Sequence, residues 1–215
     1  MRLNSSIAFP IFFSSLYAGK TRETFFPLNI YKISSTILYN ILAFKNSIIY
    51  STNMDNDLRI LVTGSAGFMG SHLVNSLIDN GFKNVNGVDD LSGGYLDNVN
   101  SKSSFTQLDL RDKKGTRELI AKVKPELIFH LAADATEGRS QFTPISCTER
   151  NYLAYLNLLV PAIQHGVKKV VLTSSMSVYG SQTPPFTEEM ERSPDDIYGI
   201  SKAAMERATE VLSKV

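Results

Sequence analysis

The sequence has little cysteine and little histidine, which limits the kinds of site it can form. Cys147 is the single cysteine, so an internal disulfide framework and a cysteine-rich zinc site are excluded. The three histidines stand far apart, without the spacing of a metal site, and we predict no bound metal. One cysteine is compatible with a reducing compartment, and we expect a cytoplasmic protein.

A large excess of charge of either sign is also missing. The formal net charge is +1, which predicts no electrostatic binding of nucleic acid. The charge is unevenly spread, because residues 1–53 carry five basic side chains and one acidic one, against 17 basic and 20 acidic in the other 162 residues. The first segment therefore differs in character from the rest of the chain.

Long hydrophobic runs are absent from residues 1–53. The longest, residues 7–18, is interrupted by Pro10 and two serines and is too short and too polar for a membrane span, so we predict no membrane partner. The basic region is too thin for a secretory signal. Met54 stands directly before the first predicted strand. We interpret residues 1–53 as an extension outside the fold, disordered or translated upstream sequence, with organellar targeting as the alternative, and residues 54–215 as the folded domain.

The remaining sequence alternates short apolar runs with segments of helical periodicity. The predicted strands are about 59–63, 84–89, 104–108, 127–131 and 168–173, and the predicted helices are about 68–80, 109–123, 146–165 and 195–215. This alternation predicts an α/β fold, a Rossmann-like doubly wound parallel sheet of strand order 3-2-1-4-5. Pro161 lies within the third helix and should kink it.

Three glycines follow the first predicted strand and open the first helix. Gly64 permits a tight turn, Gly67 lets the backbone approach a pyrophosphate, and Gly70 lets the helix pack closely on the strand. The helix N-terminus offers free N–H groups and the positive end of its dipole to phosphates. We predict a phosphate cradle; the alternative is an ordinary strand–turn–helix with glycine punctuation.

A carboxylate ends the second predicted strand. Asp89 stands 19 positions after Gly70, where a carboxylate accepts hydrogen bonds from an adenosine ribose and repels a 2′-phosphate. The next basic residue is Lys102, which favours NAD over NADP as cofactor. The alternative is a capping aspartate at a strand end.

Two further strand ends lie where the rest of the cofactor would run. Asp109 and Leu110 follow the third strand, at the place of an adenine, and turn chemistry is the alternative for this carboxylate. Leu131, Ala132 and Ala133 end the fourth strand with small residues where backbone must approach the cofactor; tight packing is the alternative.

A serine, a tyrosine and a lysine form the candidate catalytic set. Tyr198 and Lys202 are four residues apart at the start of a helix, which puts them on one face. A tyrosine of ordinary pKa is a poor base at neutral pH, and a neighbouring ammonium is expected to lower the pKa of Tyr198. Ser175, after the fifth strand, can hold a reacting hydroxyl or carbonyl group.

In combination, these motifs resemble the NAD-dependent nucleotide-sugar epimerase/dehydratase family of the extended short-chain dehydrogenase/reductase superfamily. The matching segments are residues 63–70, 88–94, 130–133, 151–159, 174–180 and 198–202. The resemblance covers residues 58–215 and implies a nucleotide-sugar substrate, a UDP-hexose, with NAD as cofactor. It also implies a homodimer through the helices that hold residues 151–163 and 198–211.

The resemblance assigns a role to each candidate residue. Gly64, Gly67, Phe68 and Met69 would face the pyrophosphate, beside Gly70. Asp89 would hold the ribose, Asp109 and Leu110 would flank the adenine, and residues 131–133 would line the cofactor path. Ser175 would position the substrate hydroxyl, Tyr198 would be the base, and Lys202 would lower the pKa of that tyrosine and hold the nicotinamide ribose.

Within the family, the residues after the catalytic serine separate the reactions. Sugar dehydratases resemble Asp-Glu where this chain has Met176 and Ser177, and decarboxylases carry a glutamate at the place of Ser177. Epimerisation is therefore favoured, with a keto-reductase and a non-catalytic NAD-binding module as alternatives. Residues 133–141 are interpreted as a solvated loop, with a sugar contact by Glu137 or Arg139 as the alternative.

Family members continue beyond the point at which this chain stops. The resemblance therefore implies a sheet truncated before the C-terminal substrate domain, and a fragment that binds NAD weakly and is inactive by itself.

Overall fold

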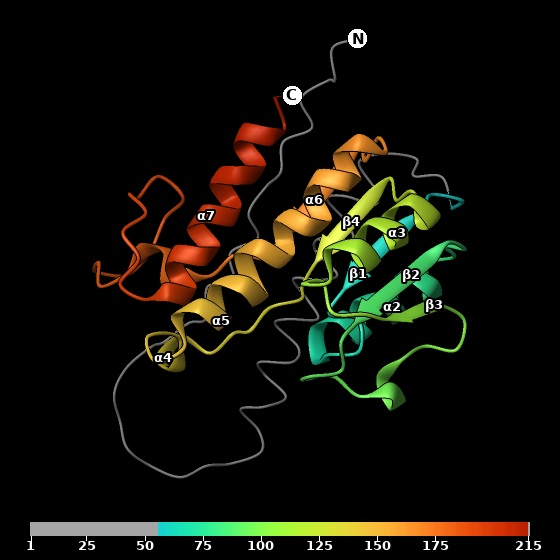
Figure 1. Ribbon diagram of the computed structural model, residues 1–215, viewed down its shortest axis with the longest axis horizontal. Helices are drawn as coiled ribbons and strands as arrows, with labels where there is room; N and C mark the ends of the chain where they lie inside the picture. The colour runs from blue at the N-terminus through green and yellow to red at the C-terminus, as the bar shows by residue number, and fades with distance from the viewer. Residues whose placement is uncertain (1–55, 215) are drawn as a thin grey trace. The chain divides into compact units, whose positions relative to one another are not determined.

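The computed structural model describes residues 56–214 of the chain, so the interpretation of residues 1–53 as an extension lies outside the described residues (Figure 1). The strands are β1 Ile60–Thr63, β2 Val85–Asp89, β3 Ser104–Gln107, β4 Leu127–His130 and β5 Lys169–Leu172. The α-helices are α2 Phe68–Asp79, α3 Lys113–Val123, α4 Glu137–Ser140, α5 Pro144–Thr148, α6 Ala154–Gln164 and α7 Ile197–Leu212. Short 3-10 turns occur at η2 Leu96–Asn98 and η4 Met176–Tyr179, and η3 Glu149–Leu153 is π-helical.

The five strands form one parallel sheet in the order β3-β2-β1-β4-β5, which confirms the predicted topology. Ile60 pairs with Val85 on one side of β1 and with Leu127 on the other. The chain thus winds outward in both directions from β1. In such sheets ligands bind at the carboxyl ends of the strands, where the winding direction changes.

Helices α3 and α6 cover one face of this sheet. Leu61 and Ile128 from the strands pack in one buried cluster with Leu119 and Ile120 of α3 and Leu158 of α6. The neighbours of Leu61 in β1 point to the opposite face and are fully buried as well. The central strand is therefore buried on both faces, as a continuous apolar run predicts.

The long helix predicted over residues 146–165 is instead α5, the π-helical turn η3 and α6 in succession. The helix starts earlier, at Pro144, because proline suits the first helical turn. The π turn is stabilised by the buried Asn151, whose amide donates to the carbonyl oxygens of Cys147 (3.0 Å) and Asp134 (3.2 Å). Pro161 lies inside α6, which continues to Gln164.

Residues 133–141, interpreted as a loop from the sequence, contain the short helix α4, which α-helical periodicity alone could not reveal in so few residues. Residues 180–194, between η4 and α7, form no helix or strand. Asp196 caps α7 by accepting from the backbone N–H of Gly199 at 2.7 Å. The buried carboxylate of Glu206 on α7 accepts from Ser174 and from Arg192, and so joins this loop to the end of β5.

Candidate active site

The glycine turn between β1 and α2 is pressed against the end of β4. Gly64 has φ +67°, a conformation that favours glycine, and a Cβ there would lie 2.8 Å from the backbone nitrogen of Ala132. A Cβ on Gly70 would lie 2.7 Å from the carbonyl carbon of Gly64 and would overlap the oxygen. Both glycines are therefore required by close backbone contacts, as the sequence predicts.

The N-terminus of α2 opens at the same turn. Gly67 is the N-cap residue, so no side chain accepts from the first amides of this helix. Phe68 is exposed and its ring packs edge-on to His72, while Met69 follows in the first turn. The free amides and the helix dipole suit an anion at this place.

Asp89 faces this turn from the end of β2. One carboxylate oxygen accepts from the N–H of Ala66 at 3.0 Å and the other from the N–H of Leu91 at 2.8 Å. The side chain is buried, yet each carboxylate oxygen has a further lone pair for a ribose hydroxyl. The observed hydrogen bonds to backbone N–H groups agree with the capping interpretation of Asp89. They leave the carboxylate able to bind a ribose as well, and the ribose role stays a prediction.

Asp109 and Leu110 follow β3, but their side chains have other contacts. The guanidinium of Arg111 forms a two-pronged contact with the Asp109 carboxylate, with Nη2 at 2.5 Å from Oδ2, and this pairing lowers the pKa of that carboxyl. The Leu110 side chain packs in the core with α3 and α6. Turn chemistry therefore describes the observed contacts of Asp109, and the adenine role remains untested.

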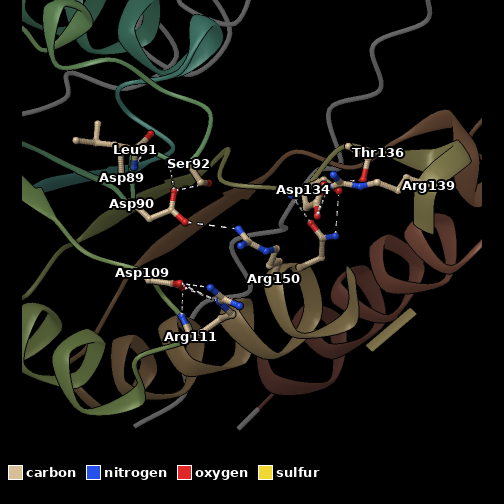
Figure 2. Close-up of polar contacts among 11 residues, drawn as sticks. Asp89, Asp90, Leu91, Ser92, Asp109, Arg111, Asp134, Thr136, Arg139 and Arg150 are labelled. Carbon is tan, nitrogen blue, oxygen red and sulfur yellow. Dashed lines mark hydrogen bonds and ion pairs between the residues drawn. The ribbon is translucent and has the colours of Figure 1, made fainter. Parts of the chain in front are cut away.

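Three aspartate–arginine pairs line the carboxyl ends of the strands (Figure 2). They are Asp90–Arg150 at 3.7 Å, Asp109–Arg111 at 2.5 Å and Asp134–Arg139 at 3.2 Å. The first pair joins the loop after β2 to the π turn. In each pair the negative charge of the aspartate is balanced by the positive charge of an arginine.

The segment after β4 is held by a threonine of β1. The hydroxyl oxygen of Thr63 accepts from the N–H groups of Leu131 (3.2 Å) and Ala132 (3.1 Å). Ala132 is therefore fixed against the glycine turn, and Ala133, next to it, is exposed. Tight packing, the alternative, describes the observed contact of Ala132 with Gly64, and the cofactor role of residues 131–133 stays a prediction.

Ser175, Tyr198 and Lys202 come together at the start of α7. The Lys202 ammonium lies 5.6 Å from the centre of the Tyr198 ring, and the Ser175 hydroxyl is close enough to favour ionisation of the Tyr198 phenol and lower its pKa. Tyr198 and Lys202 are both buried. The Lys202 Nζ donates to the carbonyl oxygen of Thr173 at 2.8 Å, which ties α7 to the end of β5.

The expected lowering of the tyrosine pKa is wrong for this structure. Burial raises the pKa of Tyr198 to about 12, and the Ser175 hydrogen bond offsets only part of that effect. Burial also lowers the pKa of Lys202 to about 8, while the nearby Glu206 carboxylate acts in the opposite direction. The pKa of Tyr198 is raised because its phenol is desolvated, while the Lys202 ammonium donates its hydrogen bond to a backbone carbonyl and not to the phenol.

Known proteins match most of the described part of this chain. Residues 60–214 match the NAD dependent epimerase/dehydratase family. The chain belongs to this family. UDP-glucose 4-epimerase of Mycolicibacterium smegmatis is 42% identical over 156 residues, which are 69% of this chain and 49% of that protein. UDP-glucose 4-epimerase of Pisum sativum is 32% identical over 168 residues, 73% of this chain and 48% of that protein.

Solved structures of epimerases have the same fold as this family member. UDP-glucose 4-epimerase of Thermotoga maritima, solved with UDP-glucose, superposes with a TM-score of 0.70 at 36% identity, over 73% of this chain and 51% of that one. The enzyme of Thermus thermophilus, solved with NAD, gives a TM-score of 0.68 at 37% identity, over 72% of this chain and 50% of that one. The chain thus spans about half the length of these relatives.

NAD is the cofactor of the epimerase/dehydratase family, and the geometry of this member fits it. The glycine turn has no room for side chains, the N-terminus of α2 is uncapped by side chains, and the Asp89 carboxylate faces the turn. No group of three or more histidine, cysteine, aspartate or glutamate side chains within residues 56–214 is arranged to hold a metal. No helix in that range is both long and apolar enough to cross a membrane.

Sequence reasoning gave no role in this epimerase-family site to Asn151, and it named Glu137 only as an alternative sugar contact. Asn151 accepts from the N–H of Asp134 at 3.0 Å and so fixes the segment after β4. Glu137, assigned to a solvated loop, is exposed but accepts a hydrogen bond from Ser177 at 2.8 Å. A carboxylate therefore reaches the residue after Met176 from another helix, although the positions after Ser175 carry none. No sequence spacing signals such a contact over 40 residues.

Proposed function

We propose that this chain carries the NAD-binding and proton-transfer part of a nucleotide-sugar epimerase similar to UDP-glucose 4-epimerase, acting on a UDP-hexose. The observation that carries the proposal is the contact of Ser175, Tyr198 and Lys202 at the same sheet edge as the glycine turn. The names of the relatives support the reaction class and the substrate.

In the proposed reaction, each residue of the site has a separate task. Tyr198 takes the proton of a sugar hydroxyl, Ser175 orients that hydroxyl, and Lys202 holds the nicotinamide ribose and keeps a positive charge near the phenol. NAD, when bound, supplies a hydride acceptor and a second positive charge beside the tyrosine. The same sugar carbon would give its hydride to that acceptor as Tyr198 takes the proton, which would leave a keto-sugar. After the keto-sugar turns over in the site, Tyr198 would return the proton to its oxygen while the hydride is returned to the opposite face of the carbon.

The pKa of Tyr198 decides when this base is available. At neutral pH, a phenol with a pKa of about 12 is almost wholly protonated. Positive charge beside the ring favours the phenolate. We therefore expect the base form to appear only in the cofactor complex.

A titration followed by an activity assay tests the proposal. NAD should bind weakly to the chain, and any conversion of UDP-galactose to UDP-glucose should be far slower than in a full-length epimerase, because the chain spans about half the length of those enzymes, with no net consumption of NADH. Tyr198→Phe should retain NAD binding and lose turnover by at least about a hundredfold, because a proton-transfer group is removed. The matched control is Tyr95→Phe, at an exposed tyrosine, which should leave both unchanged.

Other outcomes point to other functions. NAD binding without turnover would support a non-catalytic NAD-binding module, and net NADH consumption with a ketone would support a keto-reductase. Failure to bind NAD, or full turnover by Tyr198→Phe, would contradict the proposal.

Two properties of the whole protein belong to the same proposal. A homodimer would form through η3, α6 and α7, whose outer faces carry exposed apolar side chains. A cytoplasmic location agrees with the single cysteine, which is free and buried.

A further inference from the structure

Two arginines reach the end of β2 from later parts of the chain. Arg150, in the π turn, lies 3.7 Å from the carboxylate of Asp90, directly after β2 (Figure 2). Arg111 pairs with Asp109 after β3, the strand that neighbours β2 in the sheet. The fold therefore brings positive charge to a place where the order of residues along the chain indicated none.

This positive charge bears on which cofactor the site accepts. NADP differs from NAD by a phosphate on the adenosine ribose, and in this fold class a nearby arginine accommodates that phosphate. Asp89, one residue before Asp90, is the carboxylate expected to hold the ribose, so the inference rests on the NAD-binding part of the proposed function. An arginine beside this ribose would favour NADP, unless another group already holds it.

The two arginines are held by their aspartates in different ways. Arg111 donates to the Asp109 carboxylate from Nε at 2.9 Å and from Nη2 at 2.5 Å, so its fork is occupied. Arg150 Nη1 lies 3.7 Å from Asp90 Oδ2, which is too long for a hydrogen bond. The side chains of Arg150 and Asp90 are 32% and 28% exposed. Arg150 is thus the arginine that an entering phosphate could bind, and Asp90 is the group that holds it.

We propose that Asp90 is a specificity-determining residue, whose carboxylate holds Arg150 and so keeps this arginine from binding the 2′-phosphate of NADP. A phosphate at this end of the sheet would meet the negative charges of Asp89 and Asp90, while the charge of Arg150 is already balanced. NAD has an uncharged ribose and leaves the ion pair in place. The pair therefore acts together with Asp89 to select NAD.

Both partners are anchored by contacts that do not depend on the ion pair. Arg150 precedes the buried Asn151, whose side chain ties the π turn to Asp134. Asp90 Oδ1 accepts from the N–H of Ser92 at 2.8 Å and from its hydroxyl at 2.6 Å, whereas Oδ2 faces Arg150. Asparagine keeps the Oδ1 acceptor and replaces Oδ2 with an amide that only donates. Asp90→Asn therefore breaks the ion pair and keeps the turn.

Four variants separate the release of an arginine from the loss of a negative charge. Asp90→Asn releases Arg150, Arg150→Gln removes the guanidinium, and the double variant Asp90→Asn/Arg150→Gln removes both partners. Asp57→Asn is the control, because it also breaks an aspartate ion pair. Asp57 precedes β1 and lies 3.1 Å from Lys83, which precedes β2, so this pair is at the opposite end of the strands.

The readout is the ratio of the dissociation constants of the full chain for NAD and NADP, measured by isothermal titration calorimetry. A weakness of binding that is common to both cofactors cancels in this ratio. Asp90→Asn should shift the ratio toward NADP by about tenfold or more, because contacts between arginine and phosphate are charge-assisted and bidentate. The double variant should return to the ratio of the parent chain. Arg150→Gln and Asp57→Asn should show no gain for NADP.

Three results would overturn the proposal. The first is an unchanged ratio in Asp90→Asn, with circular dichroism showing that the variant is folded. The second is a gain that persists in the double variant, since the loss of a negative charge alone would then explain it. The third is an equal gain in Asp57→Asn. Asp90→Ser, whose hydroxyl can also accept from Ser92, is a second test variant and should give the same shift as Asp90→Asn.

This test and the test of the proposed function have separate outcomes. NAD binding without turnover of a sugar nucleotide would contradict the epimerase reaction and would leave the cofactor ratio measurable. An unchanged ratio would contradict the role of Asp90 alone. A chain that binds neither cofactor in any variant would contradict both proposals.

Discussion

His130, at the end of β4, has its protonation state fixed by its neighbours. The Thr63 hydroxyl oxygen already accepts two backbone N–H groups, so its proton is donated to His130 Nδ1, at 2.9 Å. The ring proton therefore lies on Nε2, which is buried without a partner in the part of the chain that the structure describes. Burial, and secondarily the charge of Lys202, lowers the pKa of His130 to about 3.

This neutral histidine predicts a loss of stability in acid. The unfolded side chain takes up a proton below its ordinary pKa of 6.5, whereas the folded one stays neutral to about 3. The unfolded state binds more protons in that window, so the free energy of unfolding should fall by about 1.4 kcal/mol per pH unit as the pH drops through it. Urea unfolding between pH 7 and pH 4 measures the slope.

The matched variants for this slope are His130→Asn and His72→Asn. His130→Asn should have a lower stability at pH 7, through lost packing on Tyr155, but a slope shallower by that amount. His72 is exposed on α2, and its variant should keep the slope of the parent chain. Equal slopes in the parent and His130→Asn would show that His130 is not the group that titrates.

For single residues, the sequence predicts where a side chain lies better than it predicts whether that side chain is ionised. The four-residue spacing of Tyr198 and Lys202 was enough to place both on one helix face, because helix geometry is local. The pKa of Tyr198 depends on burial by elements far along the chain, and so does the neutral state of His130. Neither can be derived from spacing.

The close packing of the turn between β1 and α2 predicts that one added methyl group, in Gly70→Ala, is destabilising. In a solvent-exposed helix, glycine to alanine is stabilising. Gly70→Ala should instead lower the free energy of unfolding by at least about 2 kcal/mol, because the new Cβ would overlap the Gly64 backbone. It should also abolish NAD binding, since the turn must open to relieve the overlap. Urea unfolding and NAD titration measure the two effects.

Gly93→Ala is the control for this substitution. Gly93 lies in the loop after β2, and a Cβ there would have no neighbour within 4 Å. Its stability should remain within about 0.5 kcal/mol of the parent. A Gly70→Ala variant as stable as this control would show that the turn is not as closely packed as described.

The sequence predicts the strands more accurately than the helices. The five strands were placed within one or two residues, because each is an apolar run between breakers. Helix α3 begins at Lys113 rather than at the predicted residue 109, because the Asp112 side chain caps it. The division of one expected helix into α5, η3 and α6 was missed. It depends on the contact of Asn151 with Asp134, which the helical periodicity of residues 146–165 does not contain.

For the whole molecule, exposed apolar side chains on η3, α6 and α7 predict self-association. Leu153 and Val160 are one helical repeat of seven residues apart, and Ile200 and Val211 likewise share a face of α7; all four are 41–49% exposed. The two helices are held together by the Tyr155–Thr209 hydrogen bond at 2.6 Å. Sedimentation equilibrium should therefore detect a dimer.

Val160→Glu should weaken that dimer at least about tenfold, because a charge would be buried at the contact. Tyr95→Glu changes an exposed aromatic residue in the loop after β2 and should leave the association unchanged. A monomeric parent chain, or equal effects of the two variants, would rule out this surface as the contact.

The arrangement of the site as a whole was largely predictable. Carboxyl ends of parallel strands meet at one edge, so Gly64, Asp89 and Ser175 were expected together although they span more than a hundred residues. The hydrogen bond between Glu137 and Ser177 was not predictable. It joins a four-residue helix to a short 3-10 turn, and both are too short to show a periodicity in the sequence.

The π turn at residues 149–153 sets a limit on insertions and deletions. Each α-helical residue turns the chain by about 100°, so removing one residue would convert the π turn into ordinary α-helix and rotate α5 by that angle relative to α6. Cys147 would leave its buried position, and Asn151 would lose the amide partner after β4. The number of residues between Pro144 and Ala154 is thus determined by the contacts of Asn151 and Cys147, independently of which side chains occupy the exposed positions between them.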